Sequence, residues 1–113
     1  MTAGKVSKAA ACDEHCPVRR TAGIVGYRWT TLIVRDLLGG KKRYSELLRS
    51  VSGISPRILA ERLKQLEAEG LIERTAHPTI PPTTEYELTP LGRRLEPVID
   101  AMALFGKALE ARD

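Results

Sequence analysis

Apolar and polar positions along the first half of the chain follow the spacing of short helices. The pattern predicts a helix from Pro17 to Gly26, because proline favours the first turn of a helix and glycine its end. A second helix is predicted over residues 28–38, and it is too apolar for a surface helix. We therefore expect it at the centre of the core. Residues 44–49 predict a third, short helix with a very short strand at its entrance.

The clearest helical pattern covers residues 56–69. Ser55 is the expected N-cap, Pro56 suits the first turn, and Gly70 ends the helix. One face is apolar because leucines recur at spacings of four and three, at Leu59, Leu63 and Leu66. We expect that face in the core. The opposite face is thin and carries charge, and its residues are Arg57, Glu61, Lys64 and Ala68.

Two strands are predicted after this helix, over residues 71–75 and 85–88, bounded by turn-forming residues. Residues 77–84 contain three prolines and predict a loop, because proline cannot donate to a strand ladder. Helices joined by a tight turn and followed by a hairpin form a winged helix-turn-helix. The predicted fold class is mainly α with a small β-hairpin wing (α+β). Residues 1–11 are polar and aperiodic and predict a disordered tail, so one domain spans residues 12–113.

A last helix is predicted from Thr89-Pro90 to about residue 110, with Pro97 expected to bend it or loosen one turn. Its apolar residues recur at alternating spacings of four and three, which is a heptad-like pattern. This face either packs on the chain's own core or is covered by a partner chain. The second interpretation makes it a long C-terminal dimerisation helix, assisted by the first helix, with the residues Leu91, Leu95, Val98, Met102, Phe105 and Leu109.

Positive charge is concentrated around the predicted turn motif. Residues 41–64 hold seven lysines and arginines against two glutamates, a balance of +5, whereas the whole chain of 113 residues has +4. A basic cluster on a helix-turn-helix is typical of phosphate binding. The alternative is that these charges are only solvated.

Double-stranded DNA is the partner that this arrangement predicts. Arg57 suits a guanine edge or a phosphate, and small residues beside it allow close approach to the major groove. Helix N-termini bind phosphate through free N–H groups. Arg62 lies nearer the apolar stripe and is expected to form a structural salt bridge. The predicted DNA-binding residues are Arg43, Tyr44, Ser45, Ser55, Pro56, Arg57, Ala60, Lys64 and, in the wing, His77.

Other classes of function find little support in the sequence. It contains no phosphate loop, no paired-histidine metal motif and no nucleophile elbow, so we expect no enzyme, no catalytic residue and no cofactor. No apolar run is long enough for a membrane span, and no apolar stretch follows the N-terminus as in a signal peptide. The expected location is therefore cytoplasmic.

Several motifs occur in a fixed order along the chain: Cys16-Pro17-Val18, Gly26-Tyr27-Arg28-Trp29-Thr30, Arg43-Tyr44-Ser45-Glu46-Leu47, Gly53-Ile54-Ser55-Pro56-Arg57 and Leu88-Thr89-Pro90-Leu91-Gly92. Over about residues 16–108 the chain resembles the HxlR-type winged-helix regulators. The resemblance implies a dimeric bacterial or archaeal transcription regulator. Several members respond to electrophiles or oxidants, with the cysteine at the position of Cys16 as the sensor. The family commonly has a basic residue after the wing prolines, where this chain has Thr83-Thr84, and an aromatic residue where it has His77.

The two cysteines allow more than one interpretation. Cys16 precedes a predicted helix, whose dipole favours the thiolate, so it suits a redox switch with Cys12 as the resolving thiol. Alternatively, Cys16 is a buried or capping residue and Cys12 belongs to a frayed tail. A metal set of Cys12, His15 and Cys16 does not have a usual zinc spacing, so no metal is expected.

The sequence therefore predicts a DNA-binding repressor that acts as a two-fold dimer on an inverted-repeat operator, with Cys16 as the candidate switch. A second hypothesis is a regulator whose DNA affinity follows a small apolar effector bound between the dimer helices, with Cys16 only structural. A third is a basic interaction protein without a specific target, whose binding would be weak and steeply salt-dependent.

Overall fold

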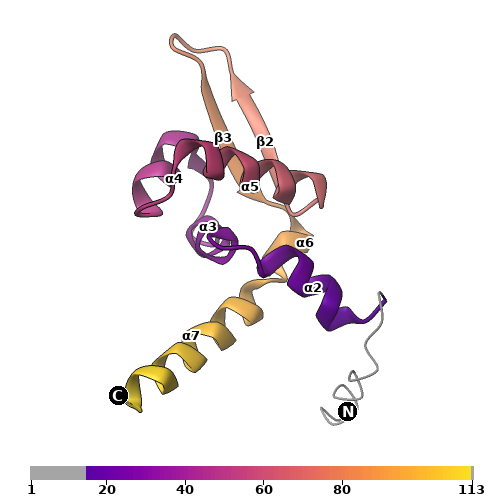
Figure 1. Cartoon of the computed structure of the whole chain (residues 1–113). Helices are drawn as coiled ribbons and strands as arrows, with labels where there is room; N and C mark the ends of the chain where they lie inside the picture. The colour runs from indigo at the N-terminus through magenta and orange to yellow at the C-terminus, as the bar shows by residue number, and fades with distance from the viewer. Residues whose placement is uncertain (1–14, 113) are drawn as a thin grey trace.

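The computed structural model describes residues 15–112. A small antiparallel sheet with the strand order β1-β3-β2 lies beside α4 and α5, its β2–β3 hairpin extends beyond these helices, and the last helix extends away from the body (Figure 1). Within the described residues, none of the helices is both long and apolar enough to cross a membrane. The elements in chain order are α2 (Pro17–Val25), α3 (Thr30–Leu37), β1 (Lys42–Arg43), α4 (Tyr44–Ser50), α5 (Pro56–Ala68), β2 (Ile72–His77), β3 (Thr83–Leu88), α6 (Pro90–Arg93) and α7 (Glu96–Ala111).

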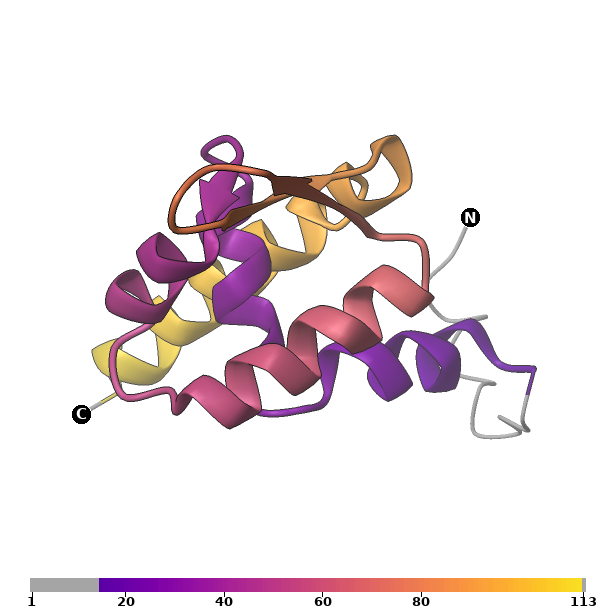
Figure 2. The ribbon, with the colours of Figure 1, turned by 90° about the horizontal axis from the view of Figure 1, so that it is seen from above.

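Helix α3 lies at the centre of the core, as its apolar composition predicts. In Figure 2 it lies inside the ring formed by α4, α5 and the strands. Its residues Ile33, Val34 and Leu37 are fully buried. They belong to the same apolar cluster as the leucine stripe of α5, which is also buried, at Leu59, Leu63 and Leu66. The apolar face of α5 is thus fixed in the core, and its opposite face is turned outward.

The predicted N-caps of two helices are confirmed. The Ser55 hydroxyl accepts a hydrogen bond from the backbone N–H of Ile58 at 3.1 Å, at the start of α5. At the start of α6, the Thr89 hydroxyl accepts from the N–H of Gly92 at 3.0 Å and donates to the carbonyl of Gly70 at 2.7 Å. A cap satisfies an N–H group that lacks a partner inside the helix. The local signals of a capping residue followed by proline therefore place both helix starts correctly.

The wing is longer than its prolines suggested. Strands β2 and β3 pair from Ile72↔Leu88 to His77↔Thr83, so the connecting loop is only residues 78–82. The expected loop over residues 77–84 was wrong because the three prolines all lie inside this shorter segment. The very short strand predicted before α4 is confirmed as β1, which pairs with β3 and makes the sheet three-stranded.

The last helix is loosened by one turn before Pro97, as the sequence predicts, and this turn divides it into α6 and α7. The turn between them has short-range bonds, from Arg94 N–H to the Leu91 carbonyl at 3.1 Å and from Leu95 N–H to the Gly92 carbonyl at 3.0 Å. Pro97 lacks the N–H that a continuous helix needs, but it is well suited to the first turn of a new helix. Leu91 consequently lies on a different helix from the other residues of the predicted heptad stripe.

Candidate nucleic-acid interface

The N-terminal half of α5 presents the predicted DNA-binding residues to solvent. Ser55, Pro56, Arg57, Ala60 and Lys64 are all exposed. The Arg57 side chain is 84% exposed, and its Nε lies 3.3 Å from Glu61 Oε2 one turn later. Exposed ion pairs of this kind contribute little to stability, so DNA could replace the carboxylate as the partner of the guanidinium. This face combines small residues with two cations on a helix whose other side is buried.

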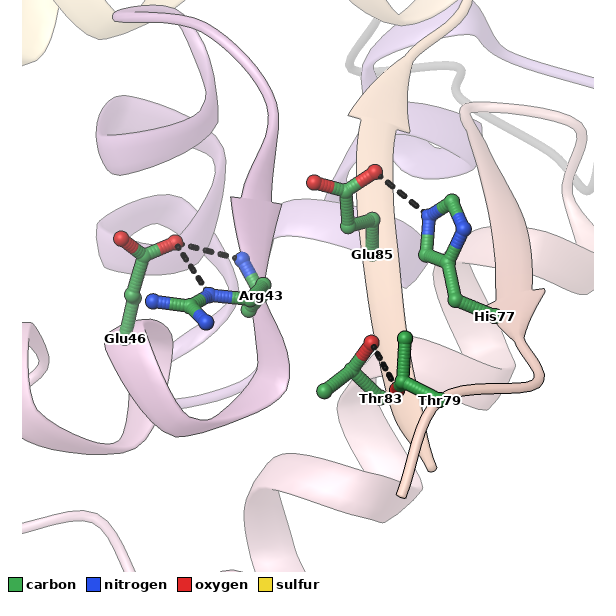
Figure 3. A network of polar contacts seen from close by, with 6 residues as sticks. All are labelled: Arg43, Glu46, His77, Thr79, Thr83 and Glu85. Carbon is green, nitrogen blue, oxygen red and sulfur yellow. Dashed lines mark hydrogen bonds and ion pairs between the residues drawn. The ribbon is translucent and has the colours of Figure 1, made fainter. Parts of the chain in front are cut away.

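The start of α4 lies beside it and is capped by a glutamate. The backbone N–H of Arg43 donates to Glu46 Oε1 at 2.7 Å, and the Arg43 Nε lies 3.8 Å from the same oxygen (Figure 3). This backbone hydrogen bond, assisted by the charges of Arg43, Lys42 and Arg49, lowers the pKa of Glu46 below its ordinary value despite an opposing desolvation. The chain's own carboxylate thus accepts the N–H of the residue that precedes α4. The side chains of Arg43 and Ser45 remain exposed.

Tyr44 lies at the junction of the two helices. Its ring is half-buried against the core, and its hydroxyl donates to the backbone carbonyl of Pro56 at 2.9 Å. The residue predicted to bind DNA therefore uses its polar atom inside the protein. It joins the first residue of α4 to the first residue of α5.

The wing carries a polar pair near its end. His77 Nε2 and Glu85 Oε1 lie 2.8 Å apart across β2 and β3 (Figure 3). Beyond this pair, the Thr79 hydroxyl donates to the carbonyl of Pro81 at 2.7 Å and lies 3.3 Å from the hydroxyl of Thr83. The imidazole nitrogen that faces Glu85 is thus engaged within the hairpin.

Most of α7 stands free of the rest of the described chain. Leu95 and Ile99 pack against the core, but every residue from Asp100 to Arg112 is exposed apart from half-buried Gly106. Four of the predicted dimerisation residues are large exposed apolar groups: Leu91 at 53%, Met102 at 46%, Phe105 at 66% and Leu109 at 38%. Leu95 and Val98 are half-buried. The stripe on α7 is therefore formed by Val98, Met102, Phe105 and Leu109.

Cys16 is the N-cap residue of α2 and is only 8% exposed. It is disulfide-bonded, so this is the oxidised form of the cysteine. Cys12, the predicted resolving thiol, lies outside the described residues, as does the expected tail over residues 1–11. Among the residues that the structure describes, no group of three His, Cys, Asp or Glu side chains could hold a metal ion.

A cavity of about 620 Å³ opens beside α2, between that helix, the end of α5 and α6. Apolar side chains line part of it, including Ile24, Leu71 and Leu95. Two arginines, Arg20 and Arg94, also line it, and within residues 15–112 neither forms an ion pair. The cavity thus combines an apolar lining with the cationic side chains of Arg20 and Arg94 and the carboxylate of Glu69.

The family follows from the sequence comparison. Residues 24–113 match the HxlR-like helix-turn-helix family model. The chain belongs to this family. An HTH-type transcriptional regulator of Synechocystis, sll1512, is 40% identical over 106 residues, which are 94% of this chain and 78% of that protein. The HxlR-like chain is accordingly a transcriptional regulator of the helix-turn-helix type.

Solved structures agree with the winged-helix assignment. A regulator of the MarR family from Porphyromonas gingivalis W83 is 44% identical, with a TM-score of 0.81 over 84% of this chain and 93% of that one. The redox regulator HypR in its oxidised form is 36% identical, with a TM-score of 0.76 over 82% of this chain and 96% of that one. These similarities confirm the predicted fold class of a winged helix with a long C-terminal helix.

The sequence of this HxlR-like chain does not predict one cluster of arginine–aromatic contacts. Arg62 on α5 was expected to form a salt bridge, but its guanidinium lies over the Tyr27 ring, 4.9 Å from the centroid, and its Nε is 3.4 Å from the carbonyl oxygen of Arg28. Arg28 in turn lies over Trp29 at 4.8 Å. These contacts join the segment between α2 and α3 to the outer helix of the turn motif. Aromatic residues beside an arginine in Gly26-Tyr27-Arg28-Trp29 are the only local signal for them.

Proposed function

We propose that the chain is a repressor that binds an inverted-repeat operator as a two-fold dimer. The observation that supports this proposal is that the N-terminal half of α5 is exposed and carries cations, while the opposite face of the helix is buried in the core. This helix enters the major groove, which is about 12 Å wide. A compact DNA-binding domain acts most simply by occupying its operator, and we place this action in the cytoplasm.

Seven side chains make the proposed DNA contacts, and two more support them. Tyr44 and His77 have polar atoms engaged within the protein, so they act by holding α5 and the wing in place. On DNA binding, the guanidinium of Arg57 leaves the Glu61 carboxylate and pairs with a base edge or a phosphate. The contacting residues are Arg43, Ser45, Ser55, Pro56, Arg57, Ala60 and Lys64.

The second copy of the chain covers α7. Helix α7 leaves the body with four large apolar side chains exposed, and three of them form one stripe that supports pairing with an identical helix: Met102, Phe105 and Leu109. Leu91 on α6 adds to the same surface. A two-fold axis through this contact separates the two α5 helices by roughly 34 Å, one turn of the duplex.

Oxidation of Cys16 is the proposed switch. Cys16 begins α2 directly, and the segment after α2 contacts α5 through Arg62, so a change at the cysteine has a physical route to the DNA-binding helix. The similarity to HypR, a redox regulator, supports this role. In the reaction, two thiols lose two protons and two electrons to an oxidant such as diamide, and one S–S bond forms.

A small-molecule effector is the alternative control. The cavity beside α2 supports it, because apolar side chains, including Ile24, Leu71 and Leu95, line part of it and suit a small apolar effector. In that case the DNA affinity changes with ligand and is indifferent to the thiol state.

A mobility-shift titration on the protein's own upstream DNA tests the proposal. The reduced protein should bind tightly and resist a scrambled competitor, diamide should release the wild type, and Cys16→Ser should stay bound. If diamide does not change DNA binding by the wild type, the thiol switch is excluded and the effector alternative is favoured. Weak binding that is steeply salt-dependent and equally competed by any DNA contradicts the repressor itself.

A further inference from the structure

The segment between α2 and α3, residues 26–29, runs beside α5 (Figure 2) and is called the connector below. The Arg62 guanidinium of α5 lies over the Tyr27 ring of the connector, 4.9 Å from the centroid. The Nε of Arg62 donates to the carbonyl oxygen of Arg28 at 3.4 Å. Among the ion pairs between described residues, none includes Arg62. The charged group of this arginine therefore has its partners in the connector.

A second contact joins the connector to the turn that leads into α5. The backbone of Trp29 has a φ of 84°, which is uncommon for a residue with a Cβ. A Cβ on Gly53, in the turn between α4 and α5, would lie 3.3 Å from Cη2 of Trp29, so the indole reaches the backbone of that turn. The connector thus contacts the recognition motif both at the entrance of α5 and near the middle of this helix.

Arg62 does not point toward the proposed DNA-binding face of α5. With 3.6 residues per turn, it lies about 140° around the helix from Arg57 and about 160° from Lys64. It lies only about 40° from Leu66, which is buried in the core. Its side chain is half-buried. A cation at this position acts on DNA only through the placement of the helix that carries it.

Two polar contacts at different points along α5 define the direction of its axis. The leucine stripe holds the helix through apolar contacts, which are not directional and leave it free to tilt by small amounts. A hydrogen bond and a stacked guanidinium depend on angle as well as distance, so they restrict this tilt. The bond from Tyr44 fixes the first residue of α5, and Arg62 fixes its middle.

We propose that Arg62 is a positioning residue that sets the tilt of α5 and thereby the half-site spacing that the dimer accepts. In a two-fold dimer a change of tilt is repeated in both copies, so it alters the separation and the angle of the two α5 helices. One base pair of spacer moves the half-sites by about 3.4 Å and rotates them by about 35°. Operators that differ by one base pair therefore report on the tilt. This inference rests on the proposed operator binding by a dimer.

The test compares full-length proteins on the operator that the wild type selects and on two versions whose spacer is one base pair shorter or longer. The wild type should bind both altered operators about tenfold more weakly. Arg62→Met keeps a long side chain without the guanidinium, and its preference for the selected spacer should fall to about threefold. Tyr27→Leu should have the same effect, and the double variant should add little, because both changes remove one shared contact.

Two variants serve as controls. Tyr27→Phe keeps the ring beneath Arg62 and should retain the wild-type spacer preference. Arg93→Met removes an exposed cation of α6 and should also behave as the wild type. The slope of log K against log salt should be unchanged in Arg62→Met, because no phosphate contact is lost, whereas Arg57→Ala should reduce it by about 1. Tyr27 is 48% exposed, so both Tyr27 variants should fold, and circular dichroism checks this.

A wild-type spacer preference in both Arg62→Met and Tyr27→Leu would overturn the positioning role. Equal weakening on all three operators would also overturn it, because loss of folded protein lowers binding alike on every operator. A salt slope reduced by about 1 in Arg62→Met would make Arg62 a phosphate contact instead. If the wild type itself shows no spacer preference, the two-fold dimer is contradicted, and the role of Arg62 with it.

Discussion

The hydroxyl of Tyr44 donates to the carbonyl oxygen of Pro56 at 2.9 Å, and so joins the first residue of α4 to the first residue of α5. The two residues are twelve positions apart, on either side of the turn between the helices. The bond fixes the end of α5 that carries Arg57. The geometry of the proposed DNA-binding face therefore depends on a contact made within the protein.

Tyr44→Phe removes only this hydrogen bond. We expect the free energy of unfolding to fall by about 0.5–1.5 kcal/mol and operator affinity to fall with it, because the start of α5 loses a constraint. Urea unfolding and a mobility-shift titration measure the two effects. Tyr27→Phe is the matched control, because it keeps the ring under Arg62, and within the described residues no hydrogen bond is made by its hydroxyl. Equal affinities for both variants would show that the bond does not position α5.

Arg57→Ala should weaken specific binding by about 1–3 kcal/mol, because a side chain that is 84% exposed has its main partner in DNA. Glu61→Gln should bind DNA as tightly as the wild type or more tightly, since it removes the carboxylate that pairs with the guanidinium of Arg57. Lys107→Ala removes an exposed cation on α7 and serves as the control. Unchanged operator affinity in Arg57→Ala would exclude Arg57 from the interface.

Phe105→Lys should convert the proposed dimer into a monomer and abolish operator binding, because it places a charge in the apolar stripe of α7. Phe105 is 66% exposed in the single chain, so the fold itself should survive. Asp100→Lys introduces the same charge on the other side of the helix and should remain dimeric. Sedimentation equilibrium measures both variants, and a fully dimeric Phe105→Lys would contradict the assignment. Leu95→Lys is a poorer test, since Leu95 packs against the core.

The cap of α4 predicts a pH dependence of stability. Because the pKa of Glu46 is lowered in the folded protein, its contribution is complete above the unfolded value of 4.5 and is lost as the pH falls below 4.5 through the folded value. Glu46→Gln should therefore be less stable than the wild type at neutral pH, and the difference should shrink on acidification. Urea unfolding at a series of pH values measures it. A difference that is constant with pH would mean that the charge of Glu46 makes no contribution.

The sequence predicts best the features whose signals are local. The cap at Ser55, the leucine stripe of α5 and the apolar centre of α3 each follow from neighbouring residues. The loosened turn before Pro97 follows from the proline itself, but the packing of α6 does not, because it depends on a distant contact. A Cβ on Gly92 would lie 2.1 Å from the carbonyl oxygen of Leu71, so α6 packs directly on the backbone before β2.

The contacts that shape the candidate site are likewise distant in the sequence. Arg62 lies 34 positions from the carbonyl of Arg28, and nothing in the helical pattern of α5 indicates that partner. The sequence predicts Tyr44 and His77 as DNA contacts from their positions at a helix start and in the wing. Their hydrogen bonds to Pro56 and Glu85 depend on how the helices and strands are placed together.

A DNase footprint of the reduced wild type on its selected operator tests the central claim most directly. The account predicts two protected half-sites, arranged as an inverted repeat with centres roughly 34 Å or about 10 base pairs apart, and equal occupancy of both at every protein concentration. Protection of a single half-site, or diffuse protection that disappears evenly with salt, would contradict a two-fold dimer that reads its operator through α5.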